Sequence, residues 1–325
     1  MLIGFSGVEG GTGAMKPTAT REAFGDVIVE LAERNPQIYV IDCDISKSCK
    51  TTKFAKVFPN RHINVGIAEQ NAAGVAAGLA TMGMIPFIST YAVFGSMRML
   101  EQIRTSVCYP RLNVKIACSH GGLTPGNDGV THQAIEDMGI YRTIPGMTVI
   151  MPADYHATKR LVEQAAQYDG PVYIRFTRDP LPVYYGPDET FEIGKGKIIR
   201  EGGDISIIAI GDSLHQALEA TRILNERGVG VRLVDMHTLK PLDSALVADC
   251  IAETGKIITV EDHNIYNGLG SAVAEVIAES GKGILRRVGL RDQFAESGEY
   301  EALLHKYQMD SAAILQRADE LLNMY

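Results

Sequence analysis

Two histidines flank a glycine-rich run near the middle of the chain. His120 and His132 stand on either side of residues 121–129, a run that holds four glycines, one proline and Asp128. This composition predicts a loop of defined shape, and loops held by a rigid scaffold often carry functional residues. The side chains could bind a metal as two histidines and one carboxylate, or the histidines could be structural. Because imidazole titrates near neutral pH, we favour polar contact or proton transfer with a hydroxylated substrate.

Glu69 is a carboxylate placed where a predicted strand at residues 62–65 passes into a helix. The helix is rich in small residues, with Ala-Ala-Gly at 72–74 and again at 76–78. A carboxylate at a helix start commonly complements the helix dipole, and spacing alone favours that ordinary interpretation. The alternative is a carboxylate in a tight, apolar contact, since small residues let a flat ligand or another helix approach closely.

Aromatic and basic side chains offer further means of binding a ligand. Tyr91, Phe94 and Met97 recur every third residue after a predicted strand, a pattern more typical of core than of a ligand platform. Arginine has a planar fork suited to bidentate recognition of phosphate. The candidates for that role are Arg21, Arg175 and Arg178. Each of the three could equally be a solvated surface charge.

Alternating strand and helix patterns predict which elements hold these residues. Short, near-continuous apolar runs separated by helical patterns indicate parallel sheets covered on both faces. Strands are expected at residues 38–41, 62–65, 85–89, 112–118, 148–151 and 172–176, then at 205–210, 229–234, 257–260 and 284–288. Prolines and glycine in residues 179–192 predict a linker. The predicted fold is α/β, with parallel-sheet domains at residues 18–178 and 193–325 and a loose extension at 1–17.

The carboxyl ends of the first-domain strands predict the place of the site, because ligands of open parallel sheets bind beyond those ends. They lead into residues 42–49, 64–70, 119–132 and 175–181, which contain most of the candidates above. The sequence thus predicts one site at this edge of the first sheet. The matching segments of the second domain are plainer, and its role stays open.

Composition and charge argue against several classes of function. The chain has 325 residues and a formal net charge of −8, so it is a poor candidate for binding nucleic acid or an anionic membrane. Its five cysteines include no Cys-x-x-Cys pair, which favours a reducing cytoplasm over a disulfide framework. No apolar run approaches the roughly 20 residues that span a bilayer. The sequence has no P-loop, and Gly268-Leu269-Gly270 is a weak dinucleotide fingerprint, which disfavours a nicotinamide-dependent reductase.

Two motifs carry a family resemblance. Asn-Val-Gly-Ile-Ala-Glu-Gln-Asn at residues 64–71 and Asp-Gly-Val-Thr-His-Gln at 128–133 closely resemble the C-terminal part of transketolase. The likeness is specifically to the separate subunit found where transketolase is encoded as two chains, and it runs from about residue 18 to the C-terminus. It implies a pyrimidine-binding domain for thiamine diphosphate, followed by the transketolase C-terminal domain.

The resemblance assigns roles at the cofactor. Glu69 matches the family's glutamate, which hydrogen-bonds the pyrimidine ring and activates the cofactor, because a carboxyl group in a water-poor site can share a proton with the ring nitrogen. The positions that stack on the pyrimidine correspond to Tyr91, Phe94 and Met97. Met97 departs from an aromatic residue, although a thioether can pack there. Asp44 and Ile45 match residues that line the pocket beside the thiazolium.

Further matches concern the substrate. His120, Asp128 and His132 match residues that meet the sugar hydroxyls and carbonyl, so the resemblance implies both histidines and Glu69 as catalytic residues. The grip on the sugar phosphate corresponds to Arg21, Ser48 and Arg178. Asn127 departs from an acidic residue, which keeps an unusual sugar open. No metal ligand is assigned to this chain.

No Gly-Asp-Gly motif occurs in the sequence, although complete thiamine enzymes carry one in the domain that holds the diphosphate and Mg²⁺. The resemblance therefore implies a partner, an N-terminal transketolase subunit that holds Mg²⁺, in an α2β2 heterotetramer with each site at a subunit interface. It implies a cytoplasmic enzyme that transfers a two-carbon ketol unit between sugar phosphates, in the pentose phosphate pathway or a specialised catabolic route.

Three alternatives stay open beside transketolase. A β-type subunit of a 2-oxo-acid dehydrogenase lacks the Asp-Gly-x-Thr-His run, and a deoxyxylulose-phosphate synthase is expected to have arginine at position 120. A non-catalytic regulatory subunit is expected to have lost part of the site, whereas Glu69 and both histidines are present.

Overall fold

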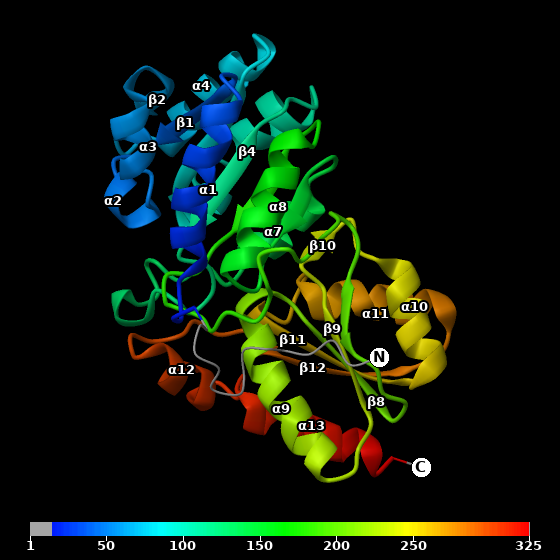
Figure 1. Cartoon of the computed structure of the whole chain (residues 1–325). Coiled ribbons are helices and arrows are strands. Elements are labelled where there is room, and N and C mark those ends of the chain that lie inside the picture. Colours follow the sequence, from blue (N-terminus) through cyan, green and yellow to red (C-terminus); the bar gives the residue numbers. More distant parts are fainter. Residues whose placement is uncertain (1–14, 325) are drawn as a thin grey trace.

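The computed structural model describes residues 15–324, which form two α/β domains with a sheet in each (Figure 1). Residues 1–14, most of the predicted N-terminal extension, lie outside this part of the chain. Within residues 15–324, no helix combines the length and the apolar character needed to cross a membrane. The predicted fold class is confirmed, and each sheet also carries one antiparallel strand that the sequence analysis did not predict.

The first sheet has seven strands in the order β10-β5-β6-β4-β3-β1-β2, and all but β10 run parallel. The parallel strands are β1 (Ile38–Asp42), β2 (His62–Asn64), β3 (Ile85–Tyr91), β4 (Lys115–Ser119), β5 (Thr148–Ile150) and β6 (Val172–Arg175). Along β6, Val172 and Ile174 belong to one buried cluster and Tyr173 to another. Since both faces are covered, the strands have near-continuous apolar sequences.

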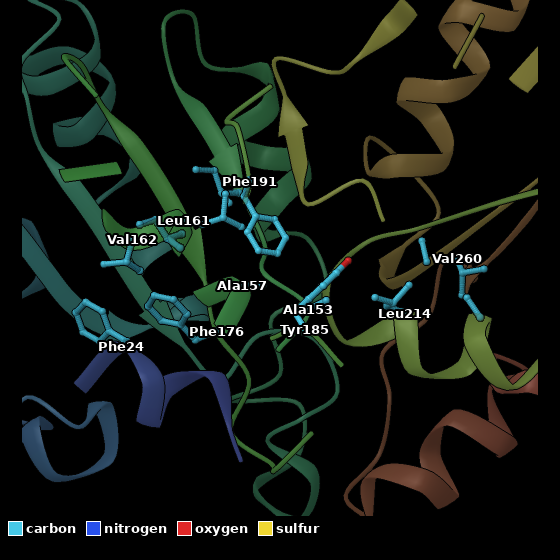
Figure 2. Packing of buried hydrophobic residues seen from close by; sticks show 14 of the residues in the cluster. Phe24, Ala153, Ala157, Leu161, Val162, Phe176, Tyr185, Phe191, Leu214 and Val260 are labelled. Carbon is cyan, nitrogen blue, oxygen red and sulfur yellow. The ribbon is translucent and has the colours of Figure 1, made fainter. Parts of the chain in front are cut away.

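Helices cover both faces of this sheet. On one face, α1 (Thr20–Arg34) packs against α8 (Tyr155–Gln167) over a core in which the Phe24 and Phe176 rings stack with centroids 4.9 Å apart (Figure 2). On the other face, α4 (Glu69–Thr81) buries Ala72, Ala73, Ala76 and Ala77. The remaining helices of the first domain are α2 (Ser46–Cys49), α3 (Thr52–Val57), α5 (Ala92–Met97), α6 (Leu100–Gln102) and α7 (Asp137–Thr143).

The second sheet has five strands in the order β12-β11-β8-β9-β7, with β7 antiparallel at one edge. Its strands are β7 (Lys197–Arg200), β8 (Ile205–Ala209), β9 (Val231–Asp235), β11 (Lys256–Asn264) and β12 (Ile284–Leu290). Its helices are α9 (Leu214–Glu226), α10 (Ser244–Glu253), α11 (Leu269–Ser280), α12 (Tyr300–Lys306) and α13 (Ser311–Leu322). In Figure 1, α9 and α13 lie together on one side of this sheet, and α10 and α11 lie on the other.

A short strand joins the two domains. β10 (Thr238–Lys240) follows the second domain's β9 yet pairs antiparallel with β5 of the first sheet, with Thr238 opposite Ile150. The predicted linker is also packed rather than loose, since Tyr185 and Phe191 are buried. The two domains therefore share a sheet edge as well as a linker.

Candidate active site

The carboxyl ends of the first-domain strands gather most of the predicted site residues, as the topology of an open parallel sheet requires. β3 ends at Tyr91 and β4 ends at Ser119, immediately before His120. These two strands are neighbours, and Tyr91 lies opposite Ser119 in the register. Glu69 begins α4 beside them, packed on the same sheet.

His120 is the most tightly held of the predicted residues. It has a left-handed backbone conformation (φ 64°), is 2% exposed, and packs against Tyr91 with ring centroids 3.9 Å apart and the ring planes tilted by 32°. Nδ1 lies 2.8 Å from the Ser119 hydroxyl, and Nε2 lies 3.5 Å from Nη1 of Arg21. A guanidinium can only donate, so Nε2 accepts and Nδ1 carries the proton that it donates to Ser119.

The electrostatic surroundings keep the His120 ring neutral. Burial, and then the positive charges of Arg21 and Arg178, lower the pKa of His120 to about 3. The ring is therefore uncharged at neutral pH and offers a fixed hydrogen-bonding group rather than a stored proton. This differs from the sequence-based expectation of an imidazole that titrates near neutrality.

An aromatic group forms around His120. The Tyr91 ring lies 5.8 Å from Phe94 and 5.7 Å from His132, and Phe94 lies 5.6 Å from His132. His132 is further fixed by the Thr131 hydroxyl, 2.9 Å from its Nδ1. The structure thus brings both histidines together with two of the three predicted stacking residues. The third, Met97, ends α5 and is 43% exposed.

Glu69 is 4% exposed, and a half-exposed cation, Arg98, lies against its carboxylate. Nη1 of Arg98 lies 3.4 Å from each carboxylate oxygen, and the Arg98 guanidinium lies 4.0 Å above the Phe94 ring. Sequence reasoning missed Arg98. The signal that could have found it is its spacing, because a residue four positions after Phe94 lies on the same face of the helical turn.

The small residues of α4 have two separate roles. The alanines face the sheet and let the helix pack closely on it. Gly74 and Gly78 are exposed, and a methyl group on either would meet no other atom. The close approach expected from this pattern is therefore the approach of helix to sheet, and the two glycines lie on the outer face.

Two of the three candidate arginines, Arg21 and Arg178, lie in the polar part of the site. Nη1 of Arg21 donates to the Ser48 carbonyl at 3.1 Å, and burial lowers the pKa of Arg21. Arg178 is one-third exposed, and its guanidinium lies 3.9 Å from Asp128 and 3.7 Å from Asp179. The structure thus places Arg21, Ser48, His120, Asp128 and Arg178 around one polar region.

Arg175 has a different place, and its interpretation as a phosphate ligand is wrong. Its side chain is completely buried, pairs with Asp137 at 3.3 Å and donates to the backbone carbonyls of Ala134 and Asp262. It can reach no ligand at the surface, and it joins the first domain to the second.

Two predicted cofactor residues lie at the end of β1, next to β3. Asp44 has a left-handed backbone (φ 67°), and its carboxylate accepts a hydrogen bond from Asn64 at 3.0 Å. The Ile45 amide donates to Asp42 at 2.8 Å. Both are therefore fixed in a tight loop, but their hydrogen bonds do not join them to the histidines. Among residues 15–324, no group of three or more His, Cys, Asp or Glu is placed to hold a metal ion.

Comparison with known proteins gives agreement along both domains. The model of the transketolase pyrimidine binding domain matches residues 16–183, and that of the transketolase C-terminal domain matches residues 194–314. A putative transketolase C-terminal section of Methanocaldococcus jannaschii is 46% identical, covering 92% of this chain and 95% of that protein. A 6-deoxy-6-sulfo-D-fructose transketolase subunit of Clostridium sp. (strain MSTE9) is 39% identical, covering 93% and 94%. A solved structure described as split gene transketolase, inactive beta4 tetramer, has a TM-score of 0.87 at 46% identity and covers 94% and 99%.

Proposed function

This chain belongs to the transketolase family, and on that premise we propose that it is one subunit of a thiamine-diphosphate-dependent transketolase. The reaction is transfer of a two-carbon ketol unit from a ketose phosphate to an aldose phosphate. One observation carries the proposal. A buried carboxylate at Glu69, an aromatic pair at Tyr91 and Phe94, and a polar cluster around His120 converge on one sheet edge.

The residues of this edge fit the pyrimidine half of the cofactor. Glu69 is nearly inaccessible to solvent, so its carboxyl group can hydrogen-bond a ring nitrogen without competition from water. Phe94 offers a ring face, and the Arg98 side chain that covers it is half-exposed and able to give way. We assign Met97, Asp44 and Ile45 to the rim of the same site. Thiamine diphosphate, when bound, supplies an electron sink for cleavage of the ketose.

The polar cluster fits the sugar. The Nε2 lone pair of neutral His120 faces Arg21 at 3.5 Å, and a substrate hydroxyl would donate to it in place of that long contact. His132 would hold or move a proton at the substrate oxygen. Asp128 would bind a sugar hydroxyl. Arg21, whose guanidinium donates to the Ser48 carbonyl, and Arg178 form the positive end of the cluster. These two arginines would bind the phosphate, with the Ser48 side chain as a further contact.

The second half of the cofactor requires a partner subunit. The chain has no Gly-Asp-Gly motif, so we propose that an N-terminal transketolase subunit holds the diphosphate and Mg²⁺ in an α2β2 assembly in the cytoplasm. Exposed apolar side chains border the site, namely Ile67 at 76%, Val130 at 45% and Met97. The proposed partner would cover these side chains. The related split gene structure, described as an inactive beta4 tetramer, supports a β chain that needs a partner.

Reconstitution tests this proposal. The tagged chain is used to isolate its partner from the native lysate in the presence of thiamine diphosphate and Mg²⁺, and ketol transfer between sugar phosphates is then assayed. We expect a stoichiometric partner bearing Gly-Asp-Gly, with activity in the complex and none in either chain alone. Activity of this chain alone would contradict the need for a partner. A cofactor-bound complex that transfers no ketol group would point to one of the related thiamine enzymes.

A further inference from the structure

The second domain lies directly against the glycine-rich loop at residues 121–129. Three of the four loop glycines have left-handed backbones and face it. A methyl group on Gly122 would overlap the Asp262 carboxylate, one on Gly126 would crowd the Gly298 carbonyl, and one on Gly129 would overlap the Ser297 hydroxyl. These glycines are thus required by the approach of the second domain as well as by the turns.

Asp262 makes the central contact. It lies near the carboxyl end of β11 and is 1% exposed, and its two carboxylate oxygens accept from the Leu123 amide at 3.1 and 2.8 Å. One guanidinium nitrogen of Arg175 donates to both the Asp262 and Ala134 carbonyls, at 2.8 and 3.0 Å. The loop is therefore tied to β11 at its beginning and, through Arg175, just beyond its end.

The outer part of the loop is held by residues 296–299 of the second domain. The Asn127 side chain donates to the Glu299 carboxylate at 2.7 Å, and the Gln133 side chain donates to the Glu296 carbonyl at 3.1 Å. The Gly298 amide donates to the Gly126 carbonyl at 3.4 Å. Asp128 and His132 lie between Asn127 and Gln133 along the chain. The positions of these two side chains therefore depend on contacts between their loop and the second domain.

We propose that Asp262 is a positioning residue, which acts through the Leu123 amide to hold the loop carrying Asp128 and His132 over the site. The second domain then serves as the platform against which the substrate loop of the first domain is set. That the loop meets a sugar rests on the function proposed above, whereas the anchoring itself rests on the contacts alone.

Asp262→Asn is the direct test, because an amide nitrogen replaces one of the two oxygens that face the Leu123 amide and turns an N–H group toward that donor. Glu261→Gln is the matched control. Glu261 is the preceding residue, is equally buried, and accepts from the Leu269 and Gly270 amides at the start of α11 instead of from the loop. Both variants replace a buried acidic side chain that accepts two hydrogen bonds from backbone amides, but only Asp262→Asn changes a contact with the loop.

Two readouts separate positioning from general destabilisation. Hydrogen exchange of residues 122–133 in the chain should rise about tenfold or more in Asp262→Asn and stay near wild type in Glu261→Gln. In the assembled complex, the KM for the donor ketose should rise several-fold in Asp262→Asn, while the affinity for thiamine diphosphate stays unchanged. Glu299→Ala, at an exposed contact that does not endanger folding, should raise exchange in the same segment by a smaller factor.

The outcomes distinguish this inference from the proposed function. Unchanged loop exchange in a folded Asp262→Asn chain, or an equal rise in both carboxylate variants, would overturn the positioning role. If Asp262→Asn does not fold, unchanged exchange in Glu299→Ala would overturn it instead. A wild-type complex without ketol transfer would refute the proposed function, and the exchange experiment would still decide the anchoring.

Discussion

The two domains end their parallel strands in the same way but use those ends differently. In the first domain the carboxyl edge carries groups that remain partly accessible, among them Tyr91, Asp128 and Arg178. In the second domain the matching edge carries Asp212, Asp235, Glu261 and Asp262, each no more than 3% exposed. The first domain covers part of that second-domain edge. The acidic side chains of the edge accept hydrogen bonds from backbone amides and tyrosine hydroxyls. The carboxyl edge of a parallel sheet is a potential ligand-binding site. The elements that pack on the edge determine whether a ligand can reach it.

Two arginines at and just after the end of β6 show the same contrast between a buried and an accessible side chain within a few residues. Arg175 ends β6 and is sealed among the acids of the domain boundary, whereas Arg178, three residues later, is one-third exposed beside Asp128. Residue type and position along the chain are nearly identical. The second domain determines which of the two can meet a ligand.

Glu69→Ala should have the largest effect of these variants. It should lower activity without changing stability. Removing the carboxylate takes away the group that would hold a proton at the cofactor ring, so kcat in the assembled complex should fall roughly 10²-fold or more. The variant should fold normally, because it shortens one side chain at a helix start. Glu101→Ala, at an exposed carboxylate of the same domain, is the control. Turnover near that of the control would remove Glu69 from the catalytic residues.

Asp235→Asn should change stability and its pH dependence, since this carboxyl group is sealed in the second domain. Burial raises the pKa of Asp235 to about 7, and its Oδ2 accepts a hydrogen bond from the Tyr185 hydroxyl at 2.7 Å. Between about pH 4 and 7 the folded chain keeps this proton while the unfolded chain releases it. The free energy of unfolding therefore falls as pH rises through that window.

The amide of Asp235→Asn does not ionise, so the variant should lose this part of the pH slope. It should be more stable than wild type at pH 8 by about 1–3 kcal/mol and show little gain at pH 4. Denaturant unfolding at several pH values measures this. Asp249→Asn removes an exposed charge and should keep the slope. A wild-type slope in Asp235→Asn would mean that the carboxyl group is ionised in the folded chain.

Arg178→Ala should act on substrate binding. Loss of a charged, bidentate contact to phosphate should raise the KM for phosphorylated sugars about tenfold and change kcat less. Arg34→Ala, at an exposed arginine paired with Glu163 on the opposite part of the domain, should change neither. An unchanged KM in Arg178→Ala would place the phosphate elsewhere in the site.

The sequence was sufficient to predict the two α/β domains, nearly all of the strands and the sheet edge at which most of the candidate residues gather, because these follow from apolar periodicity and strand topology. It was not sufficient to predict β10, whose three residues are too few to show a period. It also missed Arg98 and Asp262, and it misjudged Arg175. Their roles depend on which segments meet in space, and that information lies in tertiary contacts rather than in local spacing.

The state of His120 is a further property that residue type did not reveal. Free imidazole has a pKa near 6.5, and the expectation of polar contact or proton transfer with a substrate was drawn from that value. The structure buries the ring and sets Arg21 and Arg178 beside it, so the ionised form is disfavoured by desolvation first and by like charge second.

His120 should therefore show no titration between pH 5 and 8. This is the smallest effect among these predictions, and it tests most directly the electrostatics at the carboxyl edge of the first sheet. Histidine side-chain NMR of the chain, with His120→Gln to assign the signal, measures this. Arg21→Ala should raise the pKa of His120 only in part, because burial is the larger cause. The low pKa of His120 also makes the free energy of unfolding depend on pH. Below about pH 6.5 the unfolded ring takes up a proton and the folded ring does not. The free energy of unfolding therefore falls as the pH is lowered from about 6.5 toward 3. A His120 signal that titrates near 6.5 would mean that the ring is open to water, and its proposed role would then revert from fixed acceptor to proton carrier.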